Sequence, residues 1–564
     1  MKGYAAGVGG FGSFGRVHRV DVESAVQTTK DRPGTAGLIA RLNSLFDVIA
    51  DAKRYRLALA AILLVSVSLS AGLALSRRPF CDEAWFASPP YNLLNHGHMG
   101  MTVLDPHGFV FAALVKDIDK FTYWVLPGYL LVQAAWYSIF GFGLFTMRAL
   151  SIAFSAVALI SWYAIIYWLT GKRSVSLLAV LLLGTEEHFG LSAAMGRMDM
   201  MCATLNLVGV ASYLYLRDRG LRLALAISAT VLAIGLFTHP NAVMGIAAFA
   251  GFVLWLDFRR LRWLDLAIVA SPFLLFGGLW GLYSMKAPDA FLSQMQAQAA
   301  IPHRFELPLN PLKAIRNEFE LRYAPRYGFA TRSPLMLMRL VLFAYFAAVL
   351  AAALLPGLRK QRAARALLLW FGMNFAVLMC LQKNFYYLIF ILPMYAGLLA
   401  VAADWIWNEP FWRTWRVPRW ATAMSLAGIA ALNIGVTGSR LAHNEYSGRY
   451  LPAINKIKET MSPGDRVIGS GELAFGLGFD GTVIDDARLG LTSGVKPEFI
   501  VLEAFYGIMW FEWFTVYEPN TAAHIKNLLA TEYELILDQA KDKYPTYGLL
   551  DYPYKVYQRR PAED

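Results

Sequence analysis

The feature that most constrains this chain is a series of uninterrupted apolar runs between residues 57 and 437. Most are about 18–22 residues long, the length that an α-helix needs to cross the hydrocarbon core of a bilayer. Only 16% of the residues are charged, whereas soluble domains carry about 25%. The sequence therefore predicts an α-helical polytopic membrane protein with about eleven transmembrane helices. The approximate limits of the runs are 57–75, 147–169, 174–190, 200–216, 221–237, 240–256, 264–282, 334–355, 365–381, 385–402 and 420–437.

Short basic clusters between the apolar runs orient the predicted helices. With eleven crossings, all six clusters fall on one side of the membrane, which the positive-inside rule makes the cytoplasm. The formal net charge of +12 is then a consequence of membrane topology and does not indicate a nucleic-acid partner. This arrangement requires that residues 121–140, which contain Pro127 and Gly128, lie at the interface without crossing. The clusters are Lys53–Arg56, Gly171–Arg173, Arg217–Arg219, Arg259–Arg262, Arg359–Arg362 and Arg413–Arg419.

The spans divide the chain into three parts. Residues 1–56 are predicted to be a cytoplasmic N-terminal extension, and residues 57–437 to be the transmembrane domain. Residues 438–564 alternate helical and strand patterns, which predicts a small extracytoplasmic α/β domain. No internal repeat is visible, although such repeats mark many secondary transporters. The helices expected in the tail are 449–461 and 522–530, and the strands are 466–469, 482–484, 499–502, 533–537 and 554–557.

Charged and aromatic residues that could carry chemistry collect on the predicted extracytoplasmic face. Two adjacent carboxylates, Asp82 and Glu83, follow the first run directly, and acids are costly to hold at a membrane edge. A carboxylate can act as a general base towards a hydroxyl nucleophile, while Arg and Lys neutralise a phosphate. Asp82 and Asp199 could instead hold a divalent cation, Mg²⁺ or Mn²⁺, through oxygen ligands. The other candidates are Arg197, His239, His303, Arg304, Lys383, Tyr386 and Tyr387.

Each of these residues also has a structural interpretation. Asp82 could cap the N-terminus of an interfacial helix, and Arg197 could form an ion pair with Asp199 at the start of a helix. His239, which precedes a proline, could be a cap at a helix break. Lys383 could extend its ammonium group to the lipid headgroups.

Several motifs in order give the chain a family resemblance. It resembles the GT-C fold glycosyltransferases that use polyprenyl-phosphate sugars. It is most similar to the branch of bacterial lipid A aminoarabinose transferases and rhizobial lipopolysaccharide core transferases, with protein mannosyltransferases more distant. The resemblance covers roughly the first 400 residues. Its motifs are Asp82-Glu83-Ala84-Trp85-Phe86, Leu126-Pro127-Gly128-Tyr129-Leu130, Gly196-Arg197-Met198-Asp199, His303-Arg304-Phe305 and Lys383-Asn384-Phe385-Tyr386-Tyr387.

The resemblance implies roles for individual residues. Asp82 would be the general base that activates the acceptor hydroxyl, with Glu83 assisting or orienting it. Asp199 would be a metal ligand or a contact to the acceptor or sugar, with Arg197 beside it. The donor phosphate would be held by Arg304, Lys383 and Tyr387.

These expectations lead to one main hypothesis and two alternatives. The main one is an inverting transferase that moves a hexosyl or pentosyl group from a polyprenyl-phosphate donor to a hydroxyl of a cell-envelope lipid or glycan. It would work at the periplasmic face of a bacterial inner membrane. The first alternative is a transporter or flippase of a lipid-linked substrate, which predicts mid-membrane charges and paired broken helices. The second is a non-catalytic scaffold that binds envelope glycan and tolerates loss of Asp82.

Overall fold

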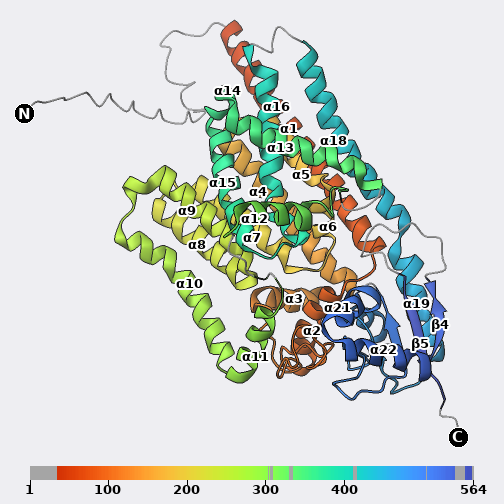
Figure 1. The fold of residues 1–564 in the computed structure, drawn as a ribbon. Coiled ribbons are helices and arrows are strands. Elements are labelled where there is room, and N and C mark those ends of the chain that lie inside the picture. Colours follow the sequence, from red (N-terminus) through yellow and green to blue (C-terminus); the bar gives the residue numbers. More distant parts are fainter. Residues whose placement is uncertain are drawn as a thin grey trace, which may run out of the picture. The chain divides into compact units, whose positions relative to one another are not determined.

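The computed structural model of the protein describes the backbone of residues 35–302, 304, 309–329, 334–410, 416–503, 505–539 and 553–561. The chain divides into two compact units, Met1–Leu57 and Ala58–Asp564. The second unit contains most of the helix bundle, the C-terminal sheet and the candidate site (Figure 1).

The prediction of a polytopic helical membrane protein is confirmed. Within the described residues, nine helical segments are long and apolar enough to cross a membrane, and a bent pair adds a tenth if its two helices form one span. That pair, α5 and α6, is bent by 68°. The bundle helices are α1 (Thr35–Ser76), α4 (Leu144–Thr170), α5 (Arg173–Gly184), α6 (Glu187–Ala193), α7 (Met198–Leu216), α8 (Leu221–Thr238), α9 (Val243–Asp257), α10 (Trp263–Ser284), α13 (Met338–Leu354), α15 (Arg362–Cys380), α16 (Leu392–Asn408) and α18 (Arg416–His443).

The tenth predicted run, 385–402, differs in form from the others. It begins as a 3₁₀ turn, η5 (Phe385–Phe390), in which the Asn384 side chain accepts a hydrogen bond from the Tyr386 amide. The α-helix, α16, starts only afterwards, with Pro393 in its first turn. Proline suits that place because its missing N–H would have no partner there anyway. Residues 385–390 are therefore available to line a site, whereas α16 packs inside the bundle.

One end of the bundle gathers the basic clusters. Lys172 Nζ lies 2.7 Å from Asp404 Oδ2, and Arg217 Nε lies 2.7 Å from Asp257 Oδ2. These contacts join the α4–α5 turn to α16 and the end of α7 to the end of α9. In the same way, Arg362 at the start of α15 stacks on Trp168 near the end of α4. Several of the predicted clusters therefore share one end of the bundle, as the topology requires.

The opposite end carries short helices and the C-terminal sheet (Figure 1). Among them, α3 has 14 residues and is about 21 Å long, too short to cross a bilayer core of about 30 Å. This agrees with the prediction that residues 121–140 do not cross. The short helices of this end are α2 (Cys81–His96), α3 (Pro127–Phe140), α11 (Pro288–Ala299), α12 (Pro311–Asn317), α19 (Leu451–Thr460), α20 (Ala474–Leu477), α21 (Trp510–Tyr517) and α22 (Pro519–Thr531), while α14 (Pro356–Arg359) lies at the basic end.

The C-terminal sheet has five strands in the order β2-β1-β3-β5-β4. Strands β2, β1 and β3 are parallel, whereas β5 runs antiparallel to both β3 and β4. All five coincide with strands predicted from the sequence, and α19 and α22 match the two predicted helices. The strands are β1 (Val467–Ile468), β2 (Val483–Ile484), β3 (Phe499–Leu502), β4 (Tyr533–Asp538) and β5 (Lys555–Arg559).

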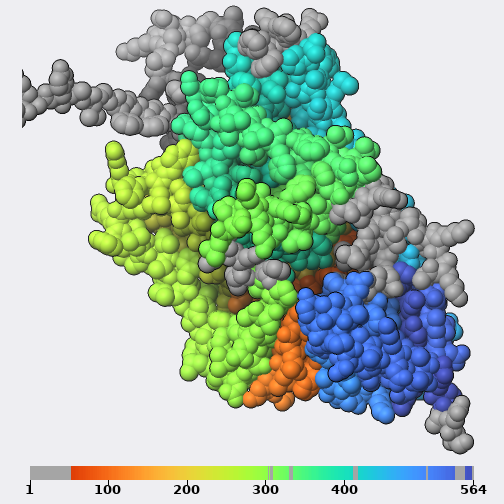
Figure 2. Space-filling model, viewed as in Figure 1, coloured from red at the N-terminus to blue at the C-terminus, as the bar shows by residue number. Residues whose placement is uncertain are grey.

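The first loop and the C-terminal sheet share a hydrophobic core. The Asp485 amide donates to the Val103 carbonyl (2.7 Å), and the Asp105 amide donates to the Asp485 carbonyl (3.1 Å). Figure 2 shows this orange loop beside the blue C-terminal residues. Apolar side chains of both segments, such as Phe109 and Phe499, belong to one buried cluster. The sheet is thereby attached to the loop that carries Asp82.

A buried ion cluster fixes the same junction. The Arg78 guanidinium, just after α1, contacts Glu472 (2.7 Å) and Glu503 (3.5 Å) of the C-terminal domain. It also donates to the Tyr554 hydroxyl (3.1 Å). Burial raises the pKa of Glu472 to about 8. The end of the first span is thus held against the C-terminal domain four residues before Asp82.

Candidate active site

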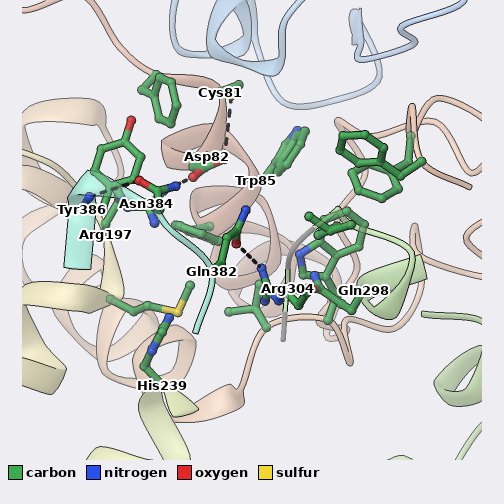
Figure 3. Close-up of a pocket in the computed structure, with 18 of the residues that line it drawn as sticks. Cys81, Asp82, Trp85, Arg197, His239, Gln298, Arg304, Gln382, Asn384 and Tyr386 are labelled. Carbon is green, nitrogen blue, oxygen red and sulfur yellow. Dashed lines mark hydrogen bonds and ion pairs between the residues drawn. The ribbon is translucent and has the colours of Figure 1, made fainter. Parts of the chain in front are cut away.

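A cavity of about 540 Å³ lies between the bundle end, the first loop and the C-terminal domain. Its walls come from the start of α2, the turn before α7, the break between α8 and α9, the loop after α11, and η5 (Figure 3). The C-terminal domain supplies one further wall. Six of the ten predicted site residues line it: Asp82, Arg197, His239, Arg304, Tyr386 and Tyr387.

Arg197 is the centre of the charged part of the cavity. Its Nη1 forms an ion pair with Asp82 Oδ2, and its Nε lies 2.8 Å from Asp199 Oδ2. The guanidinium carbon also lies 4.2 Å from the centroid of the Tyr386 ring, within the range of a cation–π contact. Two carboxylates and an aromatic face therefore fix one cation at the cavity wall (Figure 3).

The backbone explains why these groups meet. Arg197 is the N-cap residue of α7 and has extended geometry, so Asp199 falls in the first turn of that helix. A carboxylate is favoured there by the helix dipole. The expected ion pair between Arg197 and Asp199 is thus present, and Asp82 shares the same guanidinium.

Glu83 holds this constellation from behind and does not line the cavity. Its two carboxylate oxygens accept hydrogen bonds from Arg148 Nε (2.8 Å) and Nη2 (2.7 Å). They also accept the backbone N–H groups of Gly196 (2.8 Å) and Phe80 (3.0 Å). Glu83 therefore ties the start of α2 to the turn that carries Arg197. All four contacts position neighbouring groups and none faces the cavity, so Glu83 is placed to orient the site, one of the roles that the resemblance implied, and a direct catalytic role for it stays a prediction.

The interpretation of Asp82 as a helix cap is wrong. The N-cap of α2 is Phe80, whose amide donates to the Glu83 side chain. Glu83 accepts the capping hydrogen bond from the Phe80 amide. The Asp82 side chain instead pairs with Arg197 and is 22% exposed. Of the adjacent acids, one is therefore structural and the other faces the cavity.

Arg304 and two side-chain amides form another polar part of the wall. Arg304 Nη1 donates to Gln382 Oε1 (3.2 Å), and Gln298 lies on the same side of the cavity in Figure 3. The remaining N–H groups of a guanidinium can engage an anion in a bidentate manner. Arg304 lines the cavity, and its role in binding the donor phosphate stays a prediction.

His239 combines a structural role with a place in the wall. Its Nδ1 accepts the backbone N–H of Asn241 (3.0 Å), which makes it the cap of the short turn that starts the next span. Its Nε2 lies 3.9 Å from Asp199 Oδ1. Burial lowers the pKa of His239 to about 4. The imidazole is therefore neutral at physiological pH.

Lys383 does not face the cavity. Its Nζ donates to the carbonyls of Leu378 (2.9 Å) and Met379 (2.6 Å), at the end of α15, and lies 3.4 Å from Glu318 Oε2. Cations are favourable at helix C-termini. The assignment of Lys383 to the donor phosphate is corrected on this ground, and snorkelling is equally excluded. His303 lies outside the described residues.

The sequence reasoning missed the aromatic wall and the contribution of the C-terminal domain. Trp85 and Trp124 pack edge-to-face (5.7 Å between centroids), and Phe109 lies 4.4 Å from Trp124. Trp85 follows Asp82 by three residues on α2, so both lie on one helix face. That spacing was a visible signal for Trp85. Nothing local indicated the C-terminal residues Ser470, Asp485 and Tyr506, which also line the cavity.

Asp485 is a buried carboxylate at the cavity wall. Its Oδ2 accepts hydrogen bonds from Trp85 Nε1 (2.9 Å) and the Gly471 amide (2.8 Å), and its Oδ1 accepts one from the Tyr506 hydroxyl. Burial raises the pKa of Asp485 to about 6. No ion pair of Asp485 occurs in the part of the chain that the structure describes. The carboxylate is therefore supported by neutral donors alone.

The predicted divalent cation has two candidate ligands, Asp82 and Asp199. Both face the Arg197 guanidinium, which stands where a shared cation was expected. The described residues contain no group of three or more His, Cys, Asp or Glu side chains arranged to hold a metal ion. The donor set as arranged suits an arginine better than a metal, and the cation stays a prediction.

Comparisons with known proteins bear on the fold. No protein-family model matches the chain, and no curated protein sequence matches it. ArnT from Cupriavidus metallidurans in the apo state matches with a TM-score of 0.56 and 14% identity, covering 90% of this chain and 98% of ArnT. The same enzyme bound to undecaprenyl phosphate gives 0.55 and 14%, over 89% and 98%. The Archaeoglobus fulgidus oligosaccharyltransferase in its apo form gives 0.48 and 12%, over 85% and 69%.

The two ArnT matches establish the class of fold. The chain is a multi-pass membrane protein with the GT-C fold. Its architecture is similar to that of ArnT over nearly the whole length of both proteins. The fold predicted from the sequence resemblance is thereby confirmed.

Proposed function

We propose that this protein is a glycosyltransferase that moves a sugar from a polyprenyl-phosphate donor to a hydroxyl of a cell-envelope acceptor. The observation that carries the proposal is the cavity in which Asp82, Arg197 and Arg304 meet. It brings a carboxylate and two guanidinium groups together at one end of an apolar bundle. The ArnT structure of the same fold has undecaprenyl phosphate bound, which supports a lipid phosphate as the donor.

The proposed reaction is a displacement at the anomeric carbon of the donor sugar. The acceptor oxygen attacks this carbon while its proton passes to Asp82, and the bond from the carbon to the phosphate oxygen breaks. Polyprenyl phosphate leaves with that electron pair, and the sugar is transferred with inversion. General base catalysis of this kind typically contributes 10²- to 10⁴-fold in rate.

Arg197 and Arg304 are placed to stabilise the leaving phosphate. Charge that develops on the bridging oxygen is stabilised by preorganised cations at the cavity wall. An incoming phosphate competes with Asp82 for the Arg197 guanidinium. Donor binding would therefore release the Asp82 carboxylate for the acceptor hydroxyl, which orders donor before acceptor.

The membrane orientation is part of the proposal. The positive-inside rule puts the basic end of the bundle in the cytoplasm. The cavity and residues 438–564 then face the periplasm of a bacterial inner membrane, and the N-terminal extension, residues 1–56, lies in the cytoplasm. Residues 57–437 would form the catalytic transmembrane domain.

The test is Asp82→Asn in the full-length protein, reconstituted with a panel of radiolabelled polyprenyl-phosphate sugars. We expect turnover to fall at least 100-fold, with undecaprenyl phosphate binding within threefold of wild type. The matched control is Asp218→Asn, which removes an exposed carboxylate at the basic end and is expected to leave turnover unchanged. Undiminished turnover in Asp82→Asn would refute the base assignment, whereas a wild-type protein that turns over none of the donors would favour the non-catalytic scaffold.

No observation favours the transporter alternative. A transporter of this kind is expected to have two broken helices, one in each half of the protein. The described helices include one bent pair, formed by α5 and α6. The polar groups of the cavity lie at one end of the bundle. Movement of labelled lipid across vesicles without sugar transfer would reverse this conclusion.

A further inference from the structure

The C-terminal domain completes the cavity with polar groups that the proposed donor does not need. Ser470 is fully buried, lines the cavity, and its hydroxyl has no hydrogen-bond partner among the described residues. Outside that domain, Gln298 of α11, which lies beside Arg304 in Figure 3, likewise has no partner for its amide oxygen or nitrogen within the described chain. Buried polar groups without partners are rare in native proteins. Their position in a cavity wall indicates a ligand with matching hydroxyl groups.

Asp485 is the anchor of this part of the wall. The Gly471 amide, next to Ser470, holds Asp485 Oδ2, so the two side chains belong to one corner. A Cβ atom at residue 471 would lie 3.1 Å from Asp485 Oδ2 and 3.3 Å from the Trp85 indole. Glycine therefore allows the C-terminal chain to approach Trp85 closely. Among the described residues, Asp485 Oδ1 accepts one hydrogen bond, from Tyr506, which leaves it a further lone pair for a hydroxyl donor.

Trp85 and Trp124 supply the apolar side of the same corner. Their rings meet edge-to-face, and both line the cavity. The face of an aromatic ring is electronegative and its edge positive, so the faces attract the C–H groups of a sugar ring. Apolar walls with a few placed polar groups are typical of small-ligand sites.

We propose that Ser470, Asp485 and Trp85 form a subsite for a saccharide ring of the acceptor. This rests on the proposed function, because Trp85 shares a helix face with Asp82, the proposed base, and a base must reach the acceptor hydroxyl. The cationic groups that suit the donor phosphate, Arg197 and Arg304, are different residues of the wall. The acceptor is thus a glycan or glycolipid, and the C-terminal domain takes part in recognising it.

The test uses the full-length protein in detergent with a panel of methyl glycosides of common hexoses and pentoses. Saturation-transfer NMR measures sugar binding, and a separate titration measures binding of undecaprenyl phosphate. We expect at least one glycoside to bind at millimolar concentration. Asp485→Asn should weaken it at least tenfold and Ser470→Ala about threefold, with lipid-phosphate binding within twofold of wild type.

Ser470→Ala and one control variant keep the result interpretable. Ser470→Ala removes a hydroxyl with no partner, so its effect does not depend on loss of folding. Asp480→Asn is the matched control, because this carboxylate is 67% exposed and its described partners, Tyr91 and His96, both lie outside the cavity wall. It should leave both affinities unchanged.

The outcomes separate the two proposals. If no glycoside binds while undecaprenyl phosphate does, the saccharide subsite is refuted and the donor site stands. If undecaprenyl phosphate displaces the glycoside, the corner belongs to the lipid and the proposal is likewise overturned. If wild type binds no lipid phosphate but binds sugar in an Asp485-dependent way, the subsite stands and the transferase proposal fails.

Discussion

The buried pair of Glu83 and Arg148 offers the sharpest test of how the site is held together. Both side chains are almost completely inaccessible. Arg148 also donates to the carbonyls of Ala74 (2.6 Å), Arg77 (2.9 Å) and Arg78 (3.0 Å) at the end of α1. One guanidinium thus joins the first span to the carboxylate that supports the α7 turn.

We expect Glu83→Gln to destabilise this region by about 3–5 kcal/mol, the usual effect of leaving one partner of a buried ion pair uncompensated. Gln keeps one acceptor oxygen, so it cannot satisfy both Arg148 and the two amides that Glu83 now accepts. At about 1.4 kcal/mol per tenfold, the opening equilibrium at this turn shifts roughly 150- to 5,000-fold. The assay is hydrogen exchange at the Gly196 and Phe80 amides, whose N–H groups bond to Glu83.

A double-mutant cycle isolates the ion pair from general damage. Arg148→Met removes the uncompensated charge left by Glu83→Gln, so the double variant should be at least about 2 kcal/mol less destabilised than the sum of the single variants. The matched control is Glu320→Gln, which breaks an exposed pair with Arg316 and should cost no more than about 0.5 kcal/mol. Additive single effects, or exchange at Gly196 within threefold of wild type, would refute the positioning role of Glu83.

Two further predictions address the phosphate and the acceptor corner. Arg304→Ala should weaken undecaprenyl phosphate binding at least tenfold, since hydrogen bonds to charged groups contribute about 1.5–3 kcal/mol. Lys383→Met should leave that affinity within twofold of wild type, because the Lys383 Nζ is bonded to carbonyls at the end of α15. Titration with undecaprenyl phosphate measures both variants. Equal losses of affinity would show that Lys383 does contact the phosphate. Burial raises the pKa of Asp485 from 3.8 to about 6, so its contribution to stability is present below pH 4 and is lost as the pH rises through 6. The free energy of unfolding of wild type, relative to that of Asp485→Asn, should therefore fall by up to about 3 kcal/mol between pH 4 and 7. Chemical denaturation at each pH measures this difference, and a difference that does not change with pH would exclude the raised pKa of Asp485.

Local patterns in the sequence were sufficient for the architecture. Apolar runs of bilayer length predict spans because a chain in lipid must satisfy its backbone hydrogen bonds within each helix. The strands of the tail were also found correctly, from Val467–Ile468 to Lys555–Arg559. Their apolar composition and turn residues are local properties. There are two exceptions. A 3₁₀ turn at residues 385–390 precedes α16 within a run that composition alone marks as one helix, and the predicted run 174–190 is divided into α5 and α6, which are bent by 68°.

The adjacent acids Asp82 and Glu83 show what the local sequence pattern does not determine. Asp82 and Glu83 are alike in charge and adjacent in sequence, yet Arg148, 65 positions later, takes Glu83 into the core. Arg197, 115 positions later, meets Asp82 at the cavity. Which carboxylate faces the cavity depends on these distant partners. The resemblance implied different roles for the two acids, but the local sequence pattern does not show which of them faces the cavity.

The membrane-spanning architecture, the α/β tail and most of the residue types at the site therefore follow from the amino-acid sequence alone. Tertiary packing was needed to show that Lys383 caps α15 while Arg304 faces the cavity, and that Asp485 bonds to Trp85 across 400 positions. The physical reason is that helix and strand formation depends on neighbours along the chain. The direction of a charged side chain is set instead by the buried donors and acceptors that packing brings within hydrogen-bonding distance.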